Sequence, residues 1–162
     1  MRKIALAALG AALIAQPAAA QVKYIGAPTA AISRATVVPA GSDVIYVSGI
    51  TPEVTNPDAP QGTPRTFGDT KTQTLSILKQ IEAILKAEGA SMGDVFMMRV
   101  LLVGDPAKGG GMDFAGMMEG YRTYFGTAAQ PNKPARITSQ VAALVAPGMY
   151  AEIEVQAVRP KK

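Results

Sequence analysis

The stretch DTKTQTLSILKQIEAILKAEGASMGDVFMMRVLLV, residues 69–103, holds one helix and one strand whose order decides the fold. Apolar residues recur every three or four positions across residues 69–88, which is the spacing of one apolar face on an α-helix. Gly89 can close the end of that helix. Residues 95–103 then form an almost continuous apolar run with Arg99 inside it, which predicts a strand covered on both faces for most of its length.

The segments on either side of this stretch predict further strands and a second helix. Residues 43–49 are rich in β-branched and aromatic side chains, residues 136–144 also read as a strand, and residues 150–158 alternate strictly between inward and outward positions. Residues 113–125 carry aromatic and methionine side chains on one helical side. We expect residues 22–40 to add strands in a hairpin with residues 43–49.

The elements thus follow the order strands, helix, strand, helix, strand, strand. Two β-α-β units of this kind predict an α+β single domain in which one mixed β-sheet has both helices packed on one face. The other face of the sheet must be covered or solvated, and the apolar content of the strands favours covering it by association between chains.

The first 20 residues have the parts of a cleavable secretory signal peptide. Two basic residues precede an apolar run at residues 4–15, and three alanines at residues 18–20 provide a small-residue cleavage site. The run is shorter than the roughly 20 residues that a membrane-spanning helix needs, although an uncleaved anchor is the alternative. We therefore expect a mature domain of residues 21–162 that is periplasmic or secreted and has no membrane contact after cleavage.

The chain contains no cysteine and no histidine. This composition excludes disulfides, thiol nucleophiles, histidine-based triads and ordinary zinc sites, and we expect neither a cofactor nor a metal. Without residues 1–20, which hold two basic residues and no acidic one, the net charge falls from +4 to +2. Since basic residues cluster only in the C-terminal tail, we expect no nucleic-acid partner.

A glycine-rich segment, GDPAKGGGMDF at residues 104–114, raises the alternative of a phosphate-binding loop. It lacks the Gly-Lys-Ser/Thr ending that sets an ammonium group and a magnesium-binding hydroxyl against phosphates. We interpret the segment as a flexible connection.

Three residues are candidates for chemistry from their positions alone. Glu152 and Glu154 share one face of the last strand, where two carboxylates can hold and polarise a water molecule. Arg136 begins a strand after Pro134, where its guanidinium can clamp a carboxylate through two hydrogen bonds. A solvated strand face and a surface arginine are the alternative interpretations.

Five short motifs follow one another in a characteristic order. They are Val47-Ser48-Gly49, the helix end Ala87-Glu88-Gly89-Ala90-Ser91, then Gly93-Asp94-Val95, Pro134-Ala135-Arg136 and Glu152-Ile153-Glu154-Val155-Gln156-Ala157-Val158. This order resembles the reactive-intermediate deaminase (Rid, or YjgF-type) family, over about residues 28–159.

The resemblance implies a chorismate-mutase-like fold assembled as a homotrimer, with active sites in clefts between subunits. It implies hydrolysis of reactive enamines and imines, such as 2-aminoacrylate, to 2-keto acids and ammonia. By position, Arg136 would bind the carboxylate of a small-molecule substrate, Glu152 would position the attacking water, and Gly49 would line the pocket through its backbone. Residues 51–68 and 104–112 would shape the cleft.

A non-catalytic protein is the alternative that the resemblance leaves open. Such a protein would use the same trimer cleft to bind a small carboxylate or to hold an unfolded client under stress. Two departures from the family pattern favour it, because Ala35 stands at the place of the family's N-terminal tyrosine and Met118 at the place of an asparagine in the second helix.

Overall fold

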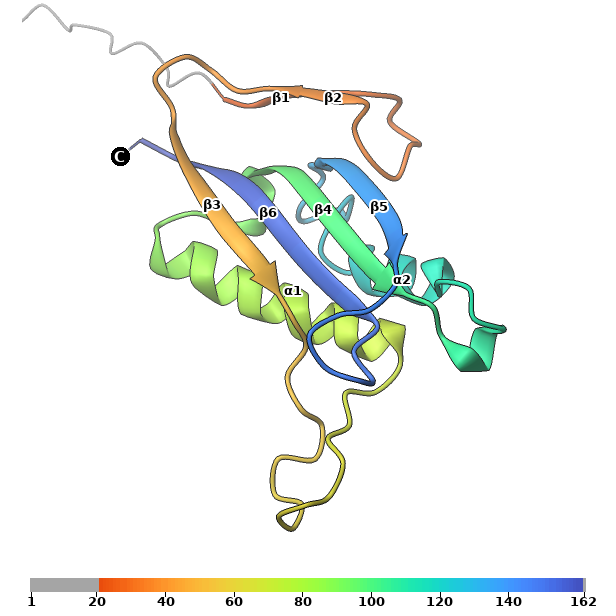
Figure 1. Ribbon diagram of the computed structural model, residues 1–162. Coiled ribbons are helices and arrows are strands. Elements are labelled where there is room, and N and C mark those ends of the chain that lie inside the picture. Colours follow the sequence, from red (N-terminus) through yellow and green to blue (C-terminus); the bar gives the residue numbers. More distant parts are fainter. Residues whose placement is uncertain (1–20, 162) are drawn as a thin grey trace, which may run out of the picture.

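A computed structural model describes residues 21–161 of the chain, so the predicted signal peptide lies outside the described residues. Six strands and two helices make up this part (Figure 1). Two single 3-10 turns, Met92–Asp94 and Pro106–Lys108, lie in the sequence on either side of the strand Val95–Val103. The elements are β1 Lys23–Ile25, β2 Ala35–Val37, β3 Asp43–Ile50, α1 Thr70–Ala87, β4 Val95–Val103, α2 Phe114–Tyr121, β5 Ala135–Val141 and β6 Ala151–Arg159.

Four strands form one mixed sheet in the order β3-β6-β4-β5. β6 pairs antiparallel with both β3 and β4, and β5 pairs parallel with β4. Because β3 and β4 both oppose β6, they run in the same direction, and β6 is inserted between the two strands of the first β-α-β unit. Both helices cover one face of the sheet, as predicted (Figure 1).

The helix ends follow from local capping. Asp69 caps α1 by accepting a hydrogen bond from the amide of Thr72 at 2.8 Å, and Gly89, with φ at 76°, follows its end. α2 stops at Tyr121, four residues before the predicted end at residue 125. There the amide of Thr123 bonds to the carbonyl three residues back, so the chain tightens into a turn instead of continuing the helix.

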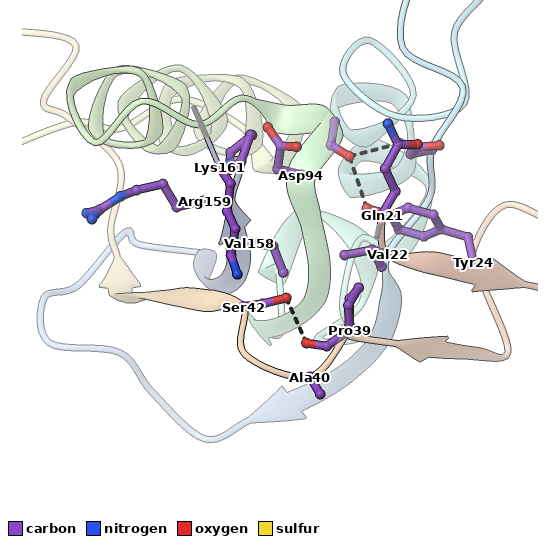
Figure 2. A pocket seen from close by; sticks show the side chains of 13 residues that line it. Gln21, Val22, Tyr24, Pro39, Ala40, Ser42, Asp94, Val158, Arg159 and Lys161 are labelled. Carbon is purple, nitrogen blue, oxygen red and sulfur yellow. Dashed lines mark hydrogen bonds between the residues drawn. The ribbon is translucent and has the colours of Figure 1, made fainter. Parts of the chain in front are cut away.

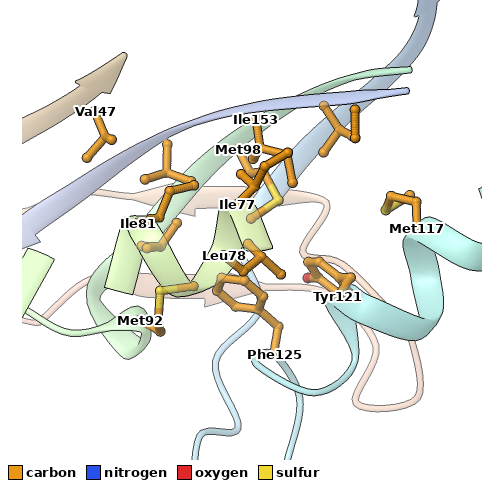
Figure 3. Close-up of a cluster of buried hydrophobic side chains, with 14 of the residues drawn as sticks. Val47, Ile77, Leu78, Ile81, Met92, Met98, Met117, Tyr121, Phe125 and Ile153 are labelled. Atoms are coloured by element: carbon orange, nitrogen blue, oxygen red, sulfur yellow. The ribbon is translucent and has the colours of Figure 1, made fainter. Parts of the chain in front are cut away.

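The core lies between the sheet and the two helices (Figure 3). Met98 and Ile153 reach down from β4 and β6, and Leu78 of α1 meets them, each with at most 1% of its surface exposed. Tyr121 and Phe125 stack on each other with ring centroids 4.9 Å apart. This cluster of buried side chains packs α1 and α2 against the sheet.

One buried polar side chain connects α1 to the turn before β6. Gln73 is fully buried and donates to the carbonyls of Gly68 and Gly148 at 2.9 and 2.8 Å. Its side-chain oxygen accepts from the amides of Tyr150 and Ala151 at 2.6 and 3.2 Å. These four bonds satisfy the side chain completely and join three segments that are distant in the sequence.

The predicted hairpin between residues 22–40 and residues 43–49 is wrong. β1 and β2 pair with each other as a separate two-stranded sheet, which Figure 1 shows lying across the end of the main sheet. Pro39 and Gly41, with φ at 71°, turn the chain before β3, and the hydroxyl of Ser42 closes this turn by donating to the Pro39 carbonyl at 2.7 Å. β3 therefore leaves in a new direction and pairs with β6.

The face of the main sheet opposite the helices is open in one chain. Tyr46 is 74% exposed and Ile137 49% exposed, although both are large apolar or aromatic side chains in strands.

Within the part of the chain that the structure describes, no helix combines the length and apolar character needed to cross a bilayer.

Candidate functional site

Arg136 lies near the start of β5, the strand at one edge of the sheet. It pairs with Met98 of β4, whose side chain is buried under the helices. Residues directly opposite each other in a ladder project to the same face, so the half-buried Arg136 side chain points toward the helix layer.

Side chains of α2 surround the guanidinium of Arg136. Nη1 lies 3.9 Å from the sulfur of Met117, and Nη2 lies 3.1 Å from the sulfur of Met118. The central carbon lies 4.5 Å from the ring centroid of Tyr121 and 5.8 Å from that of Phe114. The cation is thus stacked on an aromatic ring, while its N–H groups meet thioethers, which are weak acceptors.

No carboxylate neutralises this cation within residues 21–161. The ion pairs there join Lys71 to Glu119, Arg99 to Glu154 and Arg159 to Glu88. Burial lowers the pKa of Arg136, and the nearby Arg122 lowers it further, yet a guanidinium stays charged at neutral pH. Arg136 therefore offers a half-buried positive charge that a ligand anion can satisfy.

The N-terminal segment is fastened beside the guanidinium. The hydroxyl of Tyr121 donates to the carbonyl of Ala31 at 3.1 Å, and burial raises the pKa of Tyr121 to about 12. The ammonium group of Lys133 donates to the carbonyls of Pro28 and Ala30 at 2.7 and 2.8 Å. These contacts fix the chain between β1 and β2 on this side of the sheet.

Glu152 and Gly49 lie together on the open face of the sheet. A Cβ atom built at Gly49 would overlap the carboxylate of Glu152, so the glycine provides the room that this carboxylate occupies. Beside them is a hollow of about 40 Å³, which also contacts Leu101 of β4. Such a volume admits a few water molecules at most.

The two carboxylates on this face have different surroundings. Glu154 forms an ion pair with Arg99 at 3.3 Å, whereas Glu152 takes part in no ion pair in the described region. The carboxylate of Glu152 is therefore free to accept hydrogen bonds from water, which distinguishes it from its neighbour two residues away.

The structure does not bring Arg136 and Glu152 together within one chain. Arg136 lies opposite Met98 and Glu152 lies opposite Leu101, and these two partners are three residues apart on β4. Because these partners are an odd number of residues apart, the side chains of Arg136 and Glu152 project to opposite faces of the sheet. Their backbones are also about 10 Å apart across two strand spacings and about 10 Å apart along the strands. A site that uses both groups needs a second copy of the chain.

Apart from Met118, which the family pattern singled out, the sequence did not identify the residues that surround Arg136. Phe114, Met117, Met118 and Tyr121 follow helical spacing, which predicted an apolar face packed on the sheet. That prediction is correct for Met117, Met118 and Tyr121, which are buried, but not for Phe114, which is 43% exposed. Nothing in the spacing showed that β5 would place a guanidinium against this same helix.

A larger cavity lies elsewhere, where the N-terminal segment meets the start of β4 and the end of β6 (Figure 2). It measures about 410 Å³ and contains neither Arg136 nor Glu152. Polar groups around it bond within the chain: Tyr24 donates to the Gly93 carbonyl at 3.0 Å, and Asn132 donates to the same carbonyl at 2.9 Å. No group of three acidic side chains among the described residues could hold a metal ion there or elsewhere.

Residues 25–159 match the family model described as Endoribonuclease L-PSP. A RutC family protein of Pyrococcus horikoshii is 38% identical over 95 residues, which are 59% of this chain and 65% of that protein. A RutC family protein of Pyrococcus abyssi is 40% identical over 77 residues, 48% of this chain and 53% of that protein. The chain thus spans less than two thirds of the length of either relative.

Solved structures share the fold. A putative endoribonuclease of Thermotoga maritima is 28% identical, with a TM-score of 0.56 over 86% of this chain and 98% of the other. A protein of the conserved Rid family from Yersinia pestis is 21% identical, with a TM-score of 0.63 over 86% and 99%. The second likeness concerns the fold alone, and the predicted chorismate-mutase-like arrangement of two helices on a mixed sheet is confirmed.

Proposed function

This chain belongs to the Rid/YjgF-type family, whose model is described as Endoribonuclease L-PSP, and we propose that it hydrolyses enamines and imines of small carboxylates to 2-keto acids and ammonia. The observation that carries the proposal is the guanidinium of Arg136, which is half-buried and charged and takes part in no ion pair among residues 21–161. The paired N–H groups of a guanidinium match the two oxygens of a planar carboxylate better than other anions of that size.

Arg136 anchors the substrate in the proposed reaction. The ring of Tyr121 covers one face of the guanidinium, so a carboxylate approaches in the guanidinium plane and bonds to two N–H groups. The thioethers that contact these groups are weak acceptors, so a charged carboxylate that displaces them forms stronger hydrogen bonds to the guanidinium.

Glu152 positions the attacking water. Its carboxylate lies at the small hollow beside Gly49, which has room for water, and the ion pair between Arg99 and Glu154 leaves Glu152 as the unpaired carboxylate there. A carboxylate within hydrogen-bond reach of a water can accept its proton as the water attacks.

The chemistry requires no group beyond these two and a water. The oxygen of water adds to the imine carbon, the C=N π electrons move to nitrogen, and Glu152 takes a proton from the water. The protonated Glu152 passes that proton to the nitrogen to give the carbinolamine, which then loses ammonia as the C–N bond breaks and the C=O bond of the 2-keto acid forms, with the hydroxyl proton going to the departing nitrogen. An enamine substrate first takes a proton from water on its carbon and gives up a proton from its nitrogen to water, which converts it to the imine.

We also propose that the protein assembles as a homotrimer in which Arg136 of one copy faces Glu152 and Gly49 of its neighbour. The opposite orientation of Arg136 and Glu152 in one chain supports this assembly. The exposed apolar side chains of Tyr46 and Ile137 on the open sheet face support it as well, since burying them between copies removes apolar surface from water.

The test uses purified residues 21–162 and imines generated by an amino-acid oxidase. We expect faster release of keto acid than in buffer, and loss of that acceleration in Arg136→Ala. Arg159→Ala is the matched control, because Arg159 already pairs with Glu88 and lies outside the site. The proposal is abandoned if the wild-type protein does not accelerate release, or if Arg136→Ala releases keto acid as fast as the control.

A binding or holdase protein is the second candidate. The contact between Arg136 and Met118, at the position of the family's asparagine, favours it, because a thioether cannot orient a water as an amide can. Thermal stabilisation of the protein by 2-keto acids without any imine turnover would favour this candidate over the enzyme.

The description of the family also names an endoribonuclease, and we expect no RNA binding by this chain. The hollow beside Gly49 carries two glutamates and an arginine that is already paired, which offers little to a phosphate backbone. Incubation of RNA with the same purified protein is the corresponding measurement.

A further inference from the structure

The surroundings of Arg136 bear on which carboxylates the site accepts. Four apolar side chains surround the guanidinium. They are the thioethers of Met117 and Met118 and the aromatic rings of Tyr121 and Phe114. Met117, Met118 and Tyr121 are buried, with 0%, 5% and 1% of their surface exposed, whereas Phe114 is 43% exposed. Phe114 is thus the apolar side chain nearest to where a ligand would enter, and Met118 makes the shortest contact with the guanidinium.

The geometry of a bidentate carboxylate determines where the rest of the ligand lies. In such a pair the carboxylate is coplanar with the guanidinium, and its carbon chain continues outward, away from the arginine. Nη1 and Nη2 of Arg136 face Met117 and Met118, so a carboxylate bound there displaces the thioethers sideways and its chain runs along them.

We infer that the site selects carboxylates with an apolar chain, and that Met118 and Phe114 determine this specificity. The location of the carboxylate on Arg136 rests on the proposed function. An apolar chain in this position removes methylene groups and parts of the Phe114 ring from water, whereas a polar chain would lose hydration without gaining a hydrogen-bond partner on these side chains.

The expected effect is a graded one. Burying one methylene group increases affinity about fourfold, so the Kd of linear 2-keto acids should fall by about that factor per added carbon from pyruvate to 2-oxohexanoate. 2-Oxoglutarate has the length of 2-oxopentanoate with a terminal carboxylate, and it should bind more weakly than that acid. Tighter binding of 2-oxoglutarate than of 2-oxopentanoate would instead indicate that the neighbouring Arg122 binds the second carboxylate, and it would contradict the inference.

The experiment measures Kd by calorimetry for this series with the wild-type protein, Met118→Gln and Phe114→Gln. Both variants should flatten the dependence on chain length. Phe114→Gln changes a partly exposed residue, so it tests the inference even if Met118→Gln fails to fold. Ile84→Gln, a similar change at a 37% exposed position on α1, is the control and should keep the wild-type slope.

Turnover of imines from norleucine and glutamine separates this inference from the proposed function. Preferential turnover of the norleucine imine, with the graded Kd series, supports both. Equal turnover of the two imines with a flat Kd series overturns the inference and leaves the hydrolase standing. A graded Kd series without turnover supports the inference and removes the hydrolase. Unchanged slopes in both variants overturn the assignment to Met118 and Phe114.

Discussion

The guanidinium of Arg136 is stacked on the ring of Tyr121, with its central carbon 4.5 Å from the ring centroid. The contact of a cation with the face of an aromatic ring contributes about 0.5–2 kcal/mol of favourable free energy. The ring of Tyr121 also restricts the Arg136 side chain to one orientation. Tyr121→Leu should therefore raise KM for imine substrates by about 2- to 30-fold, with a smaller effect on kcat.

Tyr121→Phe is the matched control for this prediction. It keeps the ring and loses the hydrogen bond to the Ala31 carbonyl, so it should lower the free energy of unfolding by about 1 kcal/mol while KM stays near the wild-type value. Equal KM values for the leucine and phenylalanine variants would show that stacking does not position Arg136.

Gly49 leaves the space in which the carboxylate of Glu152 lies. Gly49→Ala should push that carboxylate aside rather than disturb the strand, because the overlapping atoms are the end of a flexible side chain. A displacement of about 1 Å can reduce kcat by up to about 100-fold, and steady-state kinetics with unchanged thermal stability would reveal it. Gly93→Ala, where the added Cβ meets nothing closer than 3.4 Å and which lies outside the proposed site, should leave kcat unaltered. A wild-type kcat in Gly49→Ala would argue against a role for Glu152.

Gln73 joins α1 to the turn before β6 through four hydrogen bonds. Gln73→Leu leaves two amides and two carbonyls without these partners in a buried place, and should lower the free energy of unfolding by about 3 kcal/mol or more. Gln80→Leu is the comparison, since Gln80 is half-buried and its amide donates only to two carbonyls; it should cost about 1 kcal/mol. Urea unfolding measures both, and similar losses would contradict the assigned role of Gln73.

Two buried phenols predict a loss of stability in alkali. Burial raises the pKa of Tyr24 and the pKa of Tyr121 from 10.0 to about 12. The folded chain thus holds these protons more tightly than the unfolded chain does, and the stabilisation is complete below pH 10 and disappears as the pH rises toward about 12. Urea midpoints across this window should fall, and fall less in Tyr24→Phe. A midpoint independent of pH in this window would refute the prediction.

Export is tested by the N-terminus of the protein from cells. The predicted cleavage after the alanines of residues 18–20 gives a chain that begins at Gln21. We expect intact mass and N-terminal sequencing of a periplasmic extract to find this residue first. A chain that keeps residues 1–20 in the membrane fraction would indicate an uncleaved anchor.

Local patterns in the sequence predicted most of the elements correctly. The apolar spacing of residues 69–88 gave α1, the continuous apolar run gave β4 with its observed bounds, and Gly89 marked where α1 ends. These features depend on neighbours a few positions away, so they can be read along the chain. The end of α2 was missed because a tight local turn with hydrogen bonds to carbonyls three residues back, rather than a breaker residue, follows it.

Local sequence patterns thus indicated which segments are helices and strands, and the family motifs singled out Arg136, Glu152 and Gly49. The pairing of distant strands is what places Glu152 beside Gly49 on the open face, joins Arg99 to Glu154, and turns Arg136 to the other face against α2. The physical reason is register: alternation along one strand is local, whereas the face that two strands share depends on how distant segments pair, and shifting that pairing by one residue would reverse every side chain.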